Sequence, residues 1–167
     1  FGAIEKLLHR FSDMHVLIPA ADEAARERII FIAGQYARLA QRMIVRVGES
    51  HRMIEAADAV LCASGTAALE AALYKKPMVV GYLMPALTGL IRCVSLPNIL
   101  MGENVVPEFL QYYCRADQIS WALQDALTND AKRKELVERF TALHESLKAD
   151  TPSLVAEVLE SRALRRW

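Results

Sequence analysis

The sequence predicts an α/β domain in which a parallel sheet is flanked by helices and followed by a helical tail. Apolar runs of strand length recur at 14–20, 43–47, 59–63 and 78–82. Helical patterns separate these runs, as expected for right-handed crossovers between parallel strands. The runs are continuous rather than alternating, which is typical of strands covered on both faces. We therefore expect a buried parallel sheet with helices on each side.

The amino-terminal elements follow from apolar spacing and capping residues. A helix is predicted over 2–10, with Ile4, Leu7 and Leu8 on one face. Asp22 is expected to cap the next helix, whose apolar face ends at Tyr36. Because the sequence opens inside an amphipathic helix without a capping residue ahead of it, we expect the chain to be a fragment of a longer protein.

The remaining elements are predicted from the same signals, with 84–93 left unassigned. Small residues in the helix at 67–74 favour its close approach to the sheet, and Pro77 follows its end. The other expected elements are a helical turn over 50–57, a short strand at 94–100 and helices at 107–113, 117–127 (capped by Asp117), 131–147 and from Thr151 onward.

Composition limits the classes of partner. The chain has 167 residues, of which 53% are apolar, and 20 basic residues balance 20 acidic ones. This balance gives no indication of a nucleic-acid partner and favours a small molecule. Three separated cysteines predict neither a disulfide framework nor a zinc site, which suits a reducing compartment. We expect no signal peptide and no membrane span.

One stretch, 59–70, joins a predicted strand to a predicted helix through Ser64, Gly65 and Thr66. Such a turn lies at the carboxyl end of a parallel strand, where ligands bind in α/β sheets. Its backbone N–H groups open a helix whose positive dipole end favours phosphate. Glu70 follows Thr66 by about one helical turn and can share the face that presents the turn. An ordinary strand-to-helix connection with a hydroxyl cap is the alternative.

Two segments, ADAVLCASGTAALEAALYKKPMVVGY and VSLPNILMGENVVPEFLQYYC, closely resemble the carboxyl-terminal half of the lipid-A-disaccharide synthase family. The resemblance covers nearly the whole chain. It implies the second Rossmann-like half of a GT-B glycosyltransferase, with a nucleotide-sugar-binding domain over 1–130 and helices over 131–167. The implied reaction is metal-free and inverting: UDP-2,3-diacylglucosamine and 2,3-diacylglucosamine 1-phosphate give the β-1,6 disaccharide phosphate and UDP. No cofactor is implied.

The resemblance also implies substrate-binding positions. Ser64, Gly65 and Thr66 match the diphosphate turn, and Glu70 matches the acid that accepts the ribose hydroxyls. Asn98 matches a position near the donor, with Glu103 and Asn104 as weaker candidates. His51 is a candidate because it follows the carboxyl end of a predicted strand; there it either contacts uracil or sugar or is a solvated loop histidine. No catalytic residue is expected here, because the general base belongs to the amino-terminal half that this sequence lacks.

Two alternative functions are also consistent with these residues. The chain is alternatively a nucleotide-sugar-binding module without turnover, or part of another UDP-N-acetylglucosamine-using GT-B enzyme. The family implies a cytoplasmic protein peripheral to the inner membrane of a Gram-negative bacterium, with a lipid monosaccharide phosphate acceptor, an amino-terminal domain as partner and a possible homodimer. The segment between Tyr82 and Val94 is shorter than the family pattern; it and the tail Arg162–Trp167 are weaker candidates for contact with acyl chains or membrane.

Overall fold

The structure is a computed structural model that describes residues 1–63, 65–83, 93–149 and five positions between 153 and 159. Helices and parallel strands alternate through most of the chain. The elements are α1 (Gly2–Leu8), β1 (Val16–Ala20), α2 (Glu23–Ala33), α3 (Ala37–Arg42), β2 (Met43–Val47), α4 (Ser50–Ala56), β3 (Val60–Cys62), α5 (Thr66–Leu73), β4 (Met78–Tyr82), α6 (Leu96–Met101), β5 (Glu108–Leu110), a 3₁₀ turn (Gln111–Tyr113), α7 (Ala116–Thr128) and α8 (Asp130–Leu147).

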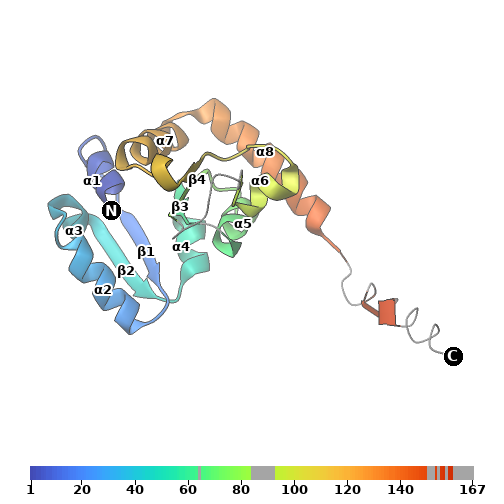
Figure 1. Ribbon diagram of the computed structural model, residues 1–167, viewed down its shortest axis with the longest axis horizontal. Coiled ribbons are helices and arrows are strands. Elements are labelled where there is room, and N and C mark those ends of the chain that lie inside the picture. The colour runs from blue at the N-terminus through green and yellow to red at the C-terminus, as the bar shows by residue number, and fades with distance from the viewer. Residues whose placement is uncertain (64, 84–92, 150–152, 154, 157, 160–167) are drawn as a thin grey trace.

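The strands form two parallel groups rather than one continuous sheet. β1 pairs with β2, with Val16 opposite Met43 and Ala20 opposite Val47. β4 is the central strand of the second group and pairs with β3 on one side and β5 on the other. Figure 1 shows the β1–β2 pair beside α2 and α3, apart from the second group. The α/β class with a parallel, helix-flanked, Rossmann-like arrangement is thus confirmed, although the described strands divide into two sheets.

β4 divides the core because its side chains alternate between two faces. Met78 and Val80 lie in a cluster with buried alanines of α5 and with Phe140 of α8. Val79 points the opposite way, into a cluster formed by α1 and α7. Met78, Val79 and Val80 are at most 1% exposed. β4 is therefore covered on both faces, as its continuous apolar run indicated, whereas Leu61 on the neighbouring β3 is 40% exposed.

Two predicted elements are wrong. Residues 94–100 were expected to form a strand, but Leu96–Met101 is α6, with Pro97 in its first turn. Residues 107–113 were expected to form a helix, but Glu108–Leu110 pairs with β4 and a 3₁₀ turn follows. The segment fills the open edge of β4, and the ladder hydrogen bonds gained there outweigh the helix signal of Pro107.

Other boundaries are close to those predicted, with two exceptions. Asp22 caps α2 as expected, accepting a hydrogen bond from the backbone N–H of Ala25 at 2.7 Å. The helix ends at Ala33, earlier than predicted, and α3 follows after a short turn. Arg115 rather than Asp117 is the N-cap residue of α7. No helix among the described residues is long and apolar enough to cross a membrane.

α8 is packed on the rest of the domain. Phe140 and Leu143 lie in the same cluster as Ala68 and Ala72 of α5. The division at residue 130 stays a prediction. The helix start expected at Thr151, the segment 84–92 and the tail 162–167 lie outside the described residues.

Candidate functional site

The predicted anion-binding turn lies at the carboxyl end of β3, where α5 begins. Gly65 is the N-cap residue of α5, with φ 77° and ψ −145°, a backbone conformation that glycine adopts without strain. Gly65 has no side chain with which to cap the helix, and among the described residues no side chain accepts a hydrogen bond from the first-turn N–H groups of α5. Thr66 is exposed, and Ser64 lies outside the described residues. The geometry suits an anion bound by backbone donors.

Glu70 lies one turn further along α5. Its side chain is half-buried, and within the part of the chain that the structure describes its carboxylate has neither a hydrogen bond nor an ion pair. A half-buried carboxylate without a protein partner is available to accept hydrogen bonds from a ligand. Glu70 therefore lies about one helical turn from Thr66, and its contact with a donor stays a prediction.

The second family segment, which begins at Val94, contacts the turn at Gly65 through Ser95. Gly65 and Ser95 form an isolated parallel β-bridge, which brings the two motifs side by side. Ser95 is fully buried and precedes α6. The two sequence segments that carry the family resemblance thus meet in space, although about 30 residues separate them.

Asn98, in α6, is 2% exposed, and its carboxamide is fully engaged inside the protein. Its oxygen accepts hydrogen bonds from the backbone N–H groups of Val105 and Val106, at 2.7 and 2.9 Å. Its nitrogen donates to the Val106 carbonyl at 2.9 Å and to Glu108 at 2.6 Å. The side chain therefore organises the loop after α6, and its contact with a donor stays a prediction.

Glu108 is the residue at this site that sequence reasoning missed. Its carboxylate, on β5, accepts hydrogen bonds from the N–H of Val94 at 2.7 Å and from the Ser95 hydroxyl at 2.6 Å. Burial opposes ionisation, but these hydrogen bonds outweigh it and lower the pKa of Glu108 below its ordinary value. The only sequence signal was an acidic residue directly after Pro107, which is equally typical of a helix start.

His51 is placed away from the turn. It lies exposed on α4, and its ring is 6.2 Å from that of Tyr74, measured between centroids. Tyr74 follows the carboxyl-terminal end of α5, about 13.5 Å along the helix from Gly65 at 1.5 Å per residue. The structure thus places His51 beside Tyr74, at the opposite end of α5 from Gly65, and its contact with a ligand stays a prediction.

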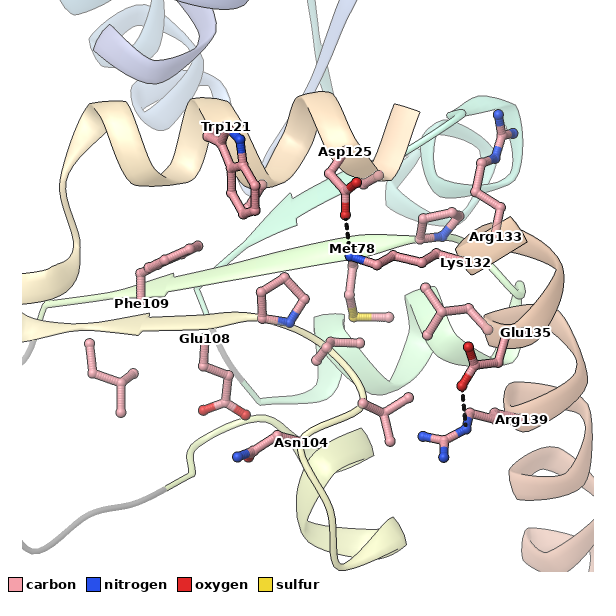
Figure 2. A pocket seen from close by; sticks show the side chains of 18 residues that line it. Met78, Asn104, Glu108, Phe109, Trp121, Asp125, Lys132, Arg133, Glu135 and Arg139 are labelled. Carbon is pink, nitrogen blue, oxygen red and sulfur yellow. Dashed lines mark hydrogen bonds and ion pairs between the residues drawn. The ribbon is translucent and has the colours of Figure 1, made fainter. Parts of the chain in front are cut away.

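A pocket of about 580 Å³ lies between β5, α7 and α8, and Glu108 is among the residues that line it (Figure 2). Four of its charged side chains form two ion pairs, Lys132 with Asp125 at 2.7 Å and Arg139 with Glu135 at 3.3 Å. Asn104 lines this pocket, and Glu103 pairs with Arg139 at 3.2 Å; the contact of either residue with a donor stays a prediction. Within the described residues, no group of three His, Cys, Asp or Glu side chains is arranged to hold a metal ion.

The fold and the turn define a Rossmann-like α/β domain with an uncapped helix start at the carboxyl end of a strand. The family model for lipid-A-disaccharide synthetase matches residues 1–159. The chain belongs to the lipid-A-disaccharide synthase family, a family of glycosyltransferases of lipid A biosynthesis. This family assignment agrees with the resemblance carried by the two motifs.

Several curated relatives cover almost all of the chain. The lipid-A-disaccharide synthases of Paraburkholderia phymatum and Paraburkholderia xenovorans are each 40% identical, over 97% and 96% of the chain. That of Saccharophagus degradans is 35% identical over 99% of the chain. The matches cover 44%, 43% and 47% of those relatives, so the chain spans less than half of their length.

Proposed function

We propose that this chain is the donor-binding portion of an inverting lipid-A-disaccharide synthase, which transfers diacylglucosamine from its UDP derivative and releases UDP. One observation carries the proposal: within the described residues, the amino terminus of α5 has no side-chain cap, and the carboxylate of Glu70, one helical turn away, has no partner. The N–H groups suit a diphosphate, and the carboxylate suits a pair of ribose hydroxyls. Ser64 and Thr66 would add hydroxyl donors to the diphosphate.

The turn would act on the leaving group. Transfer of the sugar builds negative charge on the departing diphosphate, and helix amides aimed at that charge stabilise it. A general base for the acceptor hydroxyl is expected from the amino-terminal half of the full-length protein. This chain by itself would then bind nucleotide without turnover, and the acceptor, a lipid monosaccharide phosphate, would approach from the cytoplasmic face of the inner membrane. A homodimer is a further expectation of the family resemblance.

Titration calorimetry of UDP into the full-length protein tests the assignment. We expect Glu70→Gln to weaken UDP binding by about tenfold or more, because a charged hydrogen bond contributes about 1.5–3 kcal/mol. Glu145→Gln is the matched control, since Glu145 pairs with Lys148 on the far end of α8. His51→Ala reports whether His51 contacts the nucleotide. Unchanged UDP affinity in Glu70→Gln would refute the ribose assignment.

A further inference from the structure

Glu108 receives an unusual concentration of donors from one short segment. Besides Val94 N–H and the Ser95 hydroxyl, its carboxylate accepts hydrogen bonds from the Ser95 N–H at 3.2 Å, the Cys93 thiol at 3.1 Å and the Asn98 amide at 2.6 Å. All of these donors belong to residues 93–98, around the start of α6. A single carboxylate on β5 therefore holds the entry to α6 in place.

Ser95 connects this carboxylate to the anion-binding turn. A serine before a helix usually caps it with its hydroxyl, but the Ser95 side chain makes no capping hydrogen bond to α6. Its hydroxyl donates to Glu108 instead, while its backbone forms the bridge to Gly65. Because Ser95 is 0% exposed, water does not reach it to replace Glu108 or Gly65 as a partner.

The geometry points to Glu108 as a positioning residue that fixes the turn at Gly65–Thr66 through Ser95. Glu108 does not itself contact the turn; it holds Ser95, and Ser95 holds the backbone that precedes α5. A residue on β5 thereby sets the direction of the first N–H groups of α5. The consequence for donor binding rests on the proposed function, whereas the consequence for the turn does not.

The chemistry requires a carboxylate. Its oxygens face only donors, and a glutamine would place an NH₂ group against at least one of them. Glu108→Gln therefore keeps the volume of the side chain but removes at least one of its hydrogen bonds to residues 93–98. Ser95→Ala removes only the hydroxyl and leaves the backbone bridge, and Glu145→Gln removes an exposed carboxylate far from the site.

Amide hydrogen exchange of the nucleotide-free, full-length protein gives the first measurement. We expect Glu108→Gln to speed exchange about tenfold at the helix-bonded amides 70–73 of α5, which lie on a different element from the mutation. β1 and β2 are the internal reference and should exchange as in the wild type, as should every segment of Glu145→Gln. If exchange rises only in β5 and α6 while these α5 amides are unchanged, Glu108 does not position the turn and the inference is wrong.

UDP affinity gives the second measurement, made well below the melting temperature of each variant. We expect Glu108→Gln to weaken UDP binding five- to tenfold, Ser95→Ala to weaken it in the same direction, and the double variant to be no worse than the poorer single one. Unchanged affinity in both folded single variants would overturn the inference. Should Glu108→Gln not fold, Ser95→Ala carries both measurements. If the wild type does not bind UDP, the proposed function fails, and hydrogen exchange still decides the role of Glu108.

Discussion

Asn98 and Val106 exchange hydrogen bonds in both directions. The Val106 N–H donates to the side-chain oxygen of Asn98, and the Asn98 amide donates to the Val106 carbonyl, each at 2.9 Å. The carboxamide thus forms with the Val106 backbone the two hydrogen bonds that a neighbouring strand would form. This contact joins α6 to the segment that leads into β5.

We predict that Asn98→Ala lowers the free energy of unfolding by about 3 kcal/mol, because the buried backbone N–H and carbonyl of Val106 both lose their hydrogen bonds to its side chain. Urea denaturation measures the loss. Asn98→Asp should also destabilise at neutral pH, since it places a second carboxylate 2.6 Å from that of Glu108. The Asp variant should recover part of its stability as the pH falls. If both variants lose less than about 1 kcal/mol of unfolding free energy, the Asn98 side chain does not stabilise this loop as proposed.

Gly65→Ala should be more costly than an ordinary glycine substitution. Its φ of 77° with ψ of −145° lies near a region open essentially to glycine alone, so we expect a loss of about 1–3 kcal/mol. Gly102→Ala is the control, because Gly102 at φ 68° and ψ 14° is in the left-handed helical region that other residues enter more readily. Space is open around both positions, so clashes do not confuse the comparison. Chemical denaturation that ranks Gly102→Ala as the worse variant would contradict this reading.

The elements predicted correctly are those whose signals are local. β2 and β4 have the predicted bounds, 43–47 and 78–82, because both are mostly apolar, Gly48 follows the first and Pro77 precedes the second. Residues 94–100 failed because Val94, Ser95 and Leu96 resemble a strand, whereas Pro97 lies in the first turn of a helix, a position that proline favours. β5 failed because its state depends on the edge of β4, which no local pattern reveals.

The same distinction applies to the site. The turn at Gly65 and its spacing to Glu70 are local and were predicted from a strand, a glycine and one helical turn. The contact between Ser95 and Glu108 spans 13 residues and depends on the incorrectly predicted β5. The placement of His51 beside Tyr74 depends on how α4 meets α5, which sequence spacing does not specify. Contacts between different helices and strands could therefore not be predicted from the sequence.

Acid should remove the stabilising effect of Glu108. Its pKa is lowered in the folded state, so its contribution is present above its unfolded pKa, near 4.5, and is lost as the pH falls through the folded pKa. We predict that the difference in unfolding free energy between wild type and Glu108→Gln narrows steadily from pH 6 towards pH 3. Denaturant titrations at each pH measure it. A difference that stays constant across this range would show that the charge is not responsible.

Cys93 offers a chemical reporter of Glu108. Burial, followed by the hydrogen bond and charge of Glu108, raises the pKa of the Cys93 thiol to about 11. Glu108→Gln should lower this pKa and raise the rate of alkylation by iodoacetamide at pH 8 several-fold, because the thiolate is the reacting form. Cys114 is the internal control, since burial alone raises its pKa. Equal acceleration at both thiols, measured by mass spectrometry, would instead indicate general loosening of the fold.

Phe140 tests whether α8 belongs to the same folding unit as the sheet. Its ring is 0% exposed and lies against the alanine face of α5 and Met78 of β4. Truncation of a buried phenylalanine costs about 3–5 kcal/mol, so Phe140→Ala should lower the melting temperature of one cooperative transition. Val137→Ala, in the same helix but 42% exposed, is the control and should change stability by about 0.5 kcal/mol. Calorimetry that instead shows α8 unfolding in a separate, earlier step would support a domain boundary at residue 130. A single shifted transition would mean that the helices after residue 130 help to hold α5, and through it the turn at Gly65, in place.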